Sequence, residues 1–95
     1  MKIIIIGAGG HGKVAAEIAE LNNYTDISFV DDKYPSHSMV EGWKVKKNFS
    51  SCVNNIEACA DYFVAVGDNN KRIEILNLLK KLQANIVTLI HPESS

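Results

Sequence analysis

The 95-residue sequence is long enough for one small domain, and its charge is nearly balanced, with 10 Lys and Arg against 11 Asp and Glu and a formal net charge of −1. This balance excludes the basic footprint of a nucleic-acid-binding protein and the acidic tail of a disordered one. An apolar fraction of 46% is sufficient for a core, and the N-terminal apolar run stops at Gly7, too early for a signal peptide or a membrane span. We therefore expect a cytoplasmic domain that contacts neither a membrane nor nucleic acid.

The N-terminal stretch predicts a strand, a glycine turn and a helix. Residues 3–6 are all isoleucine, and a run that is apolar at every position is typical of a strand buried on both faces of a parallel sheet. Gly7, Gly9 and Gly12 follow, where they let the backbone turn sharply and leave space beside it. Residues 11–21 then read as an amphipathic helix. Its expected buried stripe consists of Val14, Ile18 and Leu21, with Ala15 and Ala19 beside it.

The glycine turn is a candidate phosphate site. Free N–H groups at the start of the helix point into it, and such groups bind anions. The flanking strand and helix support this interpretation. His11 and Lys13 lie in the first helical turn, where cations oppose the helix dipole unless a phosphate binds there. A turn that binds nothing, a solvated lysine and a packed histidine remain the alternatives.

Two acidic residues, Asp31 and Asp32, follow the apolar run of residues 27–30, which completes a strand–helix–strand unit. They lie at the carboxyl end of that strand, the edge where open α/β sheets bind ligands. Asp31 comes 24 residues after Gly7, near the place where dinucleotide-binding folds hold a ribose hydroxyl. The alternative, an acidic strand end that only solvates a turn, fits Asp32 better than Asp31.

Residues 33–48 read as a long irregular loop, and such a loop in a compact domain is more often functional than idle. Residues 42–45 are a candidate for a brief extended segment. Trp43 is expected to anchor this loop to the core, with a position over a ligand ring as the alternative. We interpret Lys44, Lys46 and Lys47 as a solvated edge, with contact to phosphates as the alternative interpretation.

The second half of the chain continues the alternation of helix and strand. A weak helical pattern covers residues 50–60, a third buried strand covers 62–66 and a fourth covers 85–90. Between the last two, Asp68 or Asn69 is expected to cap a helix that runs to about Leu82. The buried stripe of that helix is expected to comprise Ile73, Leu76, Leu79 and Leu82.

This alternation predicts an α/β fold, a Rossmann-like open parallel sheet of about four strands with flanking helices, in a single small domain. The expected strand order is two, one, three, four, which brings residues 67–70 to the glycine turn at the switch point. Cys52 and Cys59 are expected to be buried free thiols, and no spacing suggests a metal site. His11, His37 and His91 have no partner at a catalytic spacing, and His37 is expected to be exposed, so the sequence shows a binding module without a catalyst.

Four motifs in order, IIGAGGHGKV, FVDD, DYFVAVGDNNKR and IVTLIHPES, resemble the N-terminal domain of bacterial sugar acetyltransferases that act on nucleotide-activated amino sugars such as the bacillosamine precursor, or on sialic acid. The resemblance covers essentially the whole chain. It implies a Rossmann-like domain that holds a nucleotide-sugar, typically a UDP-sugar, for polysaccharide biosynthesis. In that family a left-handed β-helix of hexapeptide repeats follows, forms a trimer, and carries acetyl-CoA with the catalytic histidine.

The resemblance also implies a set of substrate-binding residues, to which Lys13 is added from its place in the first helical turn. The matching positions are Gly7, Gly9, Gly10, His11, Gly12, Asp31, Asp32, Gly67, Asp68, Asn69 and Arg72. His91 belongs to a domain-boundary motif and is not expected to be catalytic. We expect residues 1–95 to be the nucleotide-sugar-binding domain, inactive alone, with acetyl-CoA and a homotrimer interface belonging to a β-helix domain outside them.

Two other functions fit parts of the sequence. An NAD-binding domain of a dehydrogenase or epimerase would explain the glycine spacing and Asp31, but the chain holds little more than one mononucleotide-binding half. A stand-alone ligand-binding module without an enzymatic role is the remaining alternative.

Overall fold

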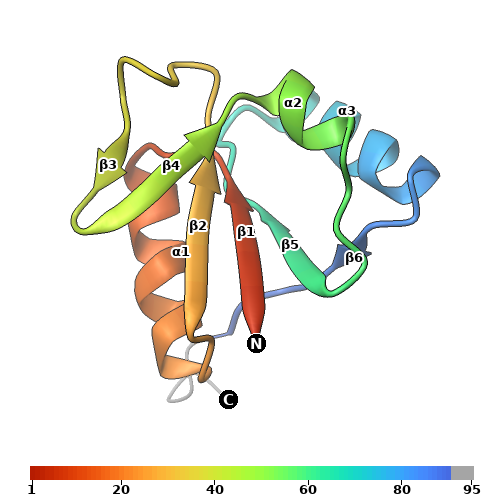
Figure 1. Cartoon of the computed structure of the whole chain (residues 1–95). Coiled ribbons are helices and arrows are strands. Elements are labelled where there is room, and N and C mark those ends of the chain that lie inside the picture. Colours follow the sequence, from red (N-terminus) through yellow and green to blue (C-terminus); the bar gives the residue numbers. More distant parts are fainter. Residues whose placement is uncertain (91–95) are drawn as a thin grey trace.

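The computed structural model describes residues 1–90, and in it six strands form one sheet with helices on both faces (Figure 1). The strands are β1 (Lys2–Ile6), β2 (Asp26–Val30), β3 (Met39–Val40), β4 (Trp43–Lys47), β5 (Ala60–Val64) and β6 (Asn85–Ile86). The helices are α1 (Gly10–Leu21), α2 (Phe49–Val53) and α3 (Asn69–Lys81). The order is β3-β4-β2-β1-β5-β6, and every pair is parallel except β3–β4. This confirms the Rossmann-like fold and the predicted order β2-β1-β5-β6 of its four expected strands.

The sheet has two more strands than the four predicted, and both come from residues 33–48, which were expected to be irregular apart from a brief extended segment at 42–45. That segment overlaps β4. β3 and β4 form a hairpin that turns through Glu41 (φ 53°) and Gly42 (φ 108°), and β4 pairs in parallel with β2. β3 has only two residues, too few for an alternating pattern. In β4 the alternation is confined to Trp43 and Val45 among lysines. Trp43 packs against the core on the α1 face, which confirms that it anchors this segment.

Alternation along the strands divides the core between the two faces of the sheet. Ile3 and Ile5 belong to the cluster beneath α1, whereas Ile4 and Ile6 belong to the cluster beneath α2 and α3. All four are buried, as expected for a strand covered on both sides. The glycine turn thus follows a strand that is fixed from both faces.

The buried face of α1 is only partly as predicted, because Ala15 and Ala19 are buried as expected whereas the larger apolar side chains are not. Val14 and Leu21 are each 54% exposed, and the helix instead buries Gly12 and its alanines. A Cβ atom at Gly12 would lie 2.2 Å from the carbonyl oxygen of Gly7, so the helix lies very close to the end of β1. Only small side chains fit between them, and the larger apolar ones are turned toward the rim of this interface. In α3 the expected stripe is wrong for Ile73 and Leu82, which are exposed, and right for Leu79, which is fully buried.

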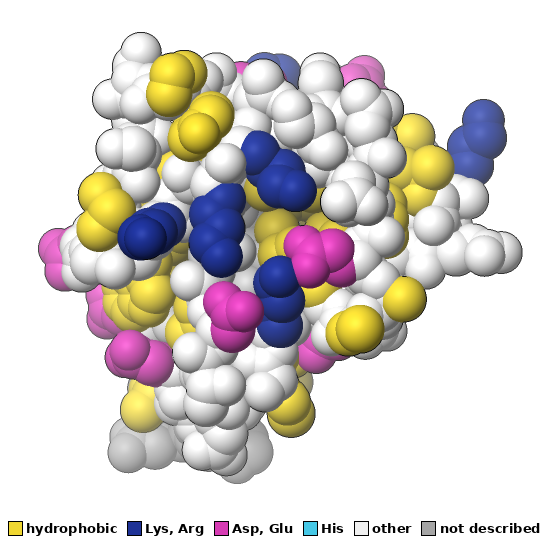
Figure 2. All heavy atoms as spheres, viewed as in Figure 1, with side chains coloured by type: hydrophobic (Ala, Val, Ile, Leu, Met, Phe, Trp, Pro, Cys, Tyr) yellow, Lys and Arg dark blue, Asp and Glu magenta, His cyan; other side chains and the backbone are white. Residues whose placement is uncertain are grey.

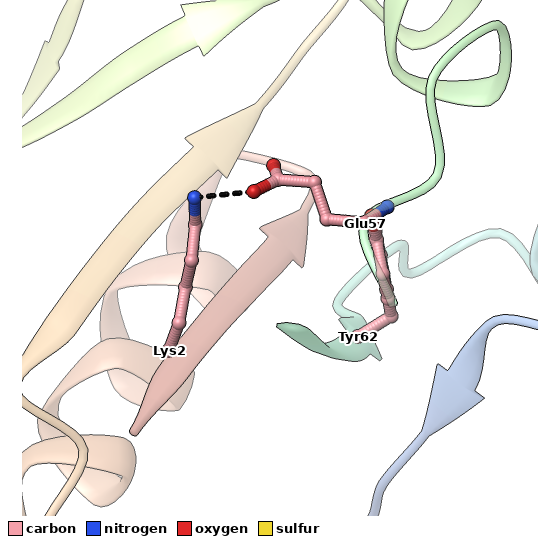
Figure 3. Close-up of polar contacts among 3 residues, drawn as sticks. All are labelled: Lys2, Glu57 and Tyr62. Atoms are coloured by element: carbon pink, nitrogen blue, oxygen red, sulfur yellow. Dashed lines mark hydrogen bonds and ion pairs between the residues drawn. The ribbon is translucent and has the colours of Figure 1, made fainter. Parts of the chain in front are cut away.

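A polar contact closes the opposite face of the sheet near the start of β1 (Figure 3). The ammonium group of Lys2 lies 2.6 Å from the Glu57 carboxylate, and the Glu57 N–H donates to the Tyr62 hydroxyl at 2.9 Å. The hydrogen bond to Glu57 raises the pKa of Lys2, and burial raises the pKa of Tyr62. These bonds tie the loop before β5 to β1 through Lys2 and to β5 through Tyr62.

Several smaller expectations differ from the structure. The predicted helix at 50–60 is the short α2, β5 begins earlier than expected, and β6 is limited to two residues. Cys52 is buried, but Cys59 is exposed, because it lies in the connection before β5. His37 is half-buried, and His91 lies outside the described residues. Lys44 and Lys46 are exposed, as a solvated edge requires, on the face where Figure 2 shows basic side chains gathered over β4.

Candidate functional site

A cleft of about 570 Å³ opens at the carboxyl ends of the central strands. It extends from the end of β2 across the glycine turn after β1 to the first turns of α3. This is the switch point of the sheet, because β1 lies between β2 and β5: the chain adds β2 and β4 on one side of β1 and then crosses over to add β5 and β6 on the other side. The cleft is lined by Ile6, Gly7, Gly9, Gly10, His11, Val30, Asp31, Asp32, Lys33, Phe49, Ala65, Val66, Gly67, Lys71, Glu74, Ile75 and Leu78.

The glycines of the turn differ in why a side chain would or would not fit at each position. Gly7 has a φ of 108°, and a Cβ atom there would lie 3.0 Å from the carbonyl oxygen of Ala65. Gly9 is the N-cap of α1 without a side-chain cap, and a Cβ atom at Gly9 or Gly10 would meet nothing within 4 Å. The N–H groups of Gly10 and His11 precede the first hydrogen bonds of the helix. The cleft therefore contains unobstructed space in front of amide donors.

Asp31 holds the glycine turn in place. Its Oδ2 accepts the Ala8 N–H at 2.8 Å, and its Oδ1 accepts the Lys33 N–H at 2.8 Å. Burial acts to raise the pKa of Asp31, but these hydrogen bonds outweigh it and the pKa lies below its ordinary value. Asp32 has a comparable role toward the start of α2, where its Oδ1 accepts the Phe49 N–H at 3.2 Å.

The turn between β5 and α3 forms the opposite wall. Asp68 is the N-cap of α3, as expected, and accepts the Lys71 N–H at 3.1 Å. His11 lies over Gly67, where a Cβ atom would be 3.7 Å from the imidazole Cδ2. The imidazole also lines a second cavity of about 650 Å³ on the α1 face of β5. His11 therefore stands between two hollows that meet at Gly67.

The structure gathers some of the predicted site residues in the cleft and leaves others outside it. Those that line the cleft are Gly7, Gly9, Gly10, His11, Asp31, Asp32 and Gly67. Those that do not are Gly12, Lys13, Asp68, Asn69 and Arg72. Gly12 is buried against Gly7, and Lys13 forms an ion pair with Glu41 at 3.1 Å. Arg72 donates to the Asn69 side chain at 3.1 Å and lines the second cavity.

Two basic residues of the cleft, Lys33 and Lys71, were missed by the sequence interpretation. Within residues 1–90 the ion pairs are those of Lys2 and Lys13, so the two cleft lysines are not engaged by carboxylates there. Lys71 was in principle detectable, because it follows a predicted N-cap by three residues and so lies in the first turn of a helix that starts at the cleft. Phe49 gave no such signal, since only part of β4, the strand before it, was expected from the sequence, at residues 42–45.

The described residues hold neither a group of His, Cys, Asp and Glu side chains that suits a metal ion nor a helix long and apolar enough to cross a membrane. The site thus consists of amide donors, two ammonium groups, carboxylates and an apolar wall. Such a cleft suits an organic anion.

Comparisons with known proteins agree with this geometry. Residues 2–79 match the family described as the PglD N-terminal domain. A curated relative, UDP-N-acetylbacillosamine N-acetyltransferase of Bacillus subtilis (strain 168), is 28% identical over 98 aligned positions, which cover 97% of this chain and 44% of that protein. The chain thus spans less than half of the length of this relative.

Solved structures show the same relationship. The acetyltransferase domain of PglB from Neisseria gonorrhoeae FA1090 is 38% identical with a TM-score of 0.84, over 96% of this chain and 44% of that one. PerB from Caulobacter crescentus, solved in complex with CoA and GDP-perosamine, is 29% identical with a TM-score of 0.81, over 97% of this chain and 43% of that one. The family match covers most of the chain, and the fold and motifs accord with it. The chain belongs to the PglD N-terminal domain family.

Proposed function

We propose that this chain is the nucleotide-sugar-binding domain of an acetyl-CoA-dependent sugar acetyltransferase, and that its cleft holds a UDP-activated amino sugar or a related nucleotide-sugar. The observation that carries the proposal is the open space before the amides of Gly10 and His11. Support also comes from the relatives, one named for a UDP-linked amino sugar and one solved with GDP-perosamine.

In this proposal the diphosphate of the nucleotide-sugar binds at the glycine turn. Backbone N–H groups at a helix start donate to phosphate oxygens, and the helix dipole favours negative charge there. Lys33 and Lys71 add positive charge from the two walls of the cleft. His11 and Gly67 lie beside the same space. Residues outside the cleft act indirectly, Gly12 through close packing and Asp68 through the cap of α3.

The chemistry of the whole enzyme is assigned to a second domain. In the reaction the acceptor amine or hydroxyl of the sugar attacks the carbonyl carbon of the acetyl-CoA thioester, a general base takes the acceptor proton, and CoA leaves as the thiol. We place that base, the acetyl-CoA site and a homotrimer interface in a C-terminal left-handed β-helix. The present domain contributes orientation of the acceptor, which lowers the entropic part of the barrier. A cytoplasmic location accords with free cysteines.

Isothermal titration calorimetry with UDP, a UDP-amino sugar, GDP and NAD tests the proposal. Saturable binding of a nucleoside diphosphate or its sugar, together with no heat from NAD, is the expected result. Binding of NAD alone would favour the dehydrogenase alternative, which retains some support from the glycine spacing. Absence of binding heat with all four ligands would favour a module that binds a different ligand.

A further inference from the structure

We infer that Phe49 is the surface on which the base of the bound nucleotide stacks, an inference that rests on the proposed function. Phe49 is the first residue of α2 and lines the cleft at its β2 end. Among the residues that line the cleft in the described part of the chain, it carries the one six-membered aromatic ring. Every base has a π-face, so such a ring binds a base without requiring a particular hydrogen-bond pattern.

Beside the glycine turn, the cleft lining offers apolar side chains at its α3 end and at its β2 end. The end over α3 is formed by the aliphatic side chains of Ile75 and Leu78 beside the charged Lys71 and Glu74. The end over β2 combines the Phe49 ring with the apolar Val30 and the polar edge of Asp32. A base is a flat aromatic ring with polar edges, and the β2 end offers both matching features.

The Phe49 ring is fixed before any ligand arrives. Its side chain is half-buried and packs against the core cluster on the α3 face. Its N–H donates to Asp32, and the residue before it, Asn48, caps α2 by accepting the Ser51 N–H at 2.9 Å. An aromatic group held this way loses little freedom when a ligand stacks on it.

This position gives a function to the β3–β4 hairpin, of which the sequence analysis expected only a brief extended segment at 42–45. The Asp31 N–H donates to the Lys47 carbonyl at 3.1 Å, and β4 pairs with β2, so α2 starts directly beside the acidic pair. Trp43, the other aromatic considered for a ligand ring, packs on the opposite face. The β3–β4 hairpin therefore positions Phe49 at the cleft.

The test compares the affinities of UDP and inorganic pyrophosphate for wild type, Phe49→Leu and Phe49→Tyr. Leucine keeps the apolar packing and removes the π-face, whereas tyrosine keeps the ring. Phe63→Leu is the matched control, because Phe63 is also half-buried but packs on the α1 face. Calorimetry gives the affinities, and the shifts of the uracil H5 and H6 protons in NMR spectra report ring stacking directly.

We expect Phe49→Leu to weaken UDP about tenfold, the lower range for loss of one base–aromatic stack, and to leave pyrophosphate within about twofold of wild type. The upfield shift of H5 and H6 should disappear in that variant and persist in Phe49→Tyr and Phe63→Leu. Equal weakening of UDP and pyrophosphate, or unchanged UDP affinity, would overturn the inference while the proposed function stands. Failure of wild type to bind UDP and GDP would overturn both.

Discussion

A side chain at Gly9 should weaken nucleotide binding roughly tenfold to hundredfold and leave the fold intact. The backbone of Gly9, with φ −80° and ψ −160°, is extended and open to any residue, and its Cβ position is free of neighbours within 4 Å. The Cβ atom of Gly9→Val would therefore fit without a clash, on a residue that lines the cleft. Since valine is a poorer N-cap than glycine, we expect a stability loss of about 0.5–1 kcal/mol.

The cost to binding should be much larger than the cost to stability. The valine methyl groups would occupy the space in front of the first amides of α1, where we place the diphosphate. A hydrogen bond to a charged group contributes about 1.5–3 kcal/mol, so loss of one such bond corresponds to roughly a tenfold to hundredfold lower affinity. Calorimetry with UDP measures this loss, and thermal unfolding followed by circular dichroism measures the stability.

Gly12→Ala is the comparison variant in the same motif, because its first effect should be on stability rather than on the space before the amides. Its Cβ atom would lie 2.2 Å from the Gly7 carbonyl oxygen and 2.9 Å from the Phe29 ring. Such overpacking costs about 1–3 kcal/mol, equivalent to a fall in Tm of several degrees, at about 4–8 °C per kcal/mol. The reasoning is refuted if Gly9→Val unfolds the domain, or if it binds UDP as wild type does.

Three further predictions concern single side chains. Lys71→Ala should weaken UDP about threefold to tenfold at low salt, whereas Lys13→Ala should not change UDP affinity, and calorimetry at two salt concentrations distinguishes them. Asp31→Asn should destabilise the domain by about 1–2 kcal/mol at pH 7. Because the folded-state pKa of Asp31 is lowered, its contribution to stability is present above the unfolded pKa of about 4 and is lost as the pH falls through the folded pKa. Urea unfolding should therefore show the stability difference between wild type and variant shrinking toward pH 2. Tyr62→Phe should cost about 1–1.5 kcal/mol, since the Glu57 N–H loses its acceptor, and a denaturation curve with an unchanged midpoint would contradict this.

The order of the central strands was predictable because strong local signals marked each element. Four consecutive isoleucines define β1, the glycines mark where it ends, and Asp68 caps α3 as its residue type suggests. The position of the cleft followed from the topology alone, since the carboxyl ends of parallel strands meet at one edge. Seven of the proposed site residues line it for that reason.

The errors have a common physical cause, namely that a neighbouring element decides what a residue does. Periodicity places Val14 on the apolar stripe of α1, but the close approach at Gly12 leaves room only for alanines. The contact of Lys13 was not predicted either, because the hairpin turn brings Glu41 to it. No pattern within the sequence reveals a contact supplied by the turn after a strand as short as β3.

The central claim is that the amides at the start of α1 receive the diphosphate of a nucleotide. Titration of ¹⁵N-labelled protein with UDP, followed by amide NMR spectra, tests it most directly. We predict that the largest saturable shifts belong to Gly9, Gly10 and His11. Shifts confined to the second cavity or to the lysines of β4, with these three amides unmoved at saturation, would contradict the account.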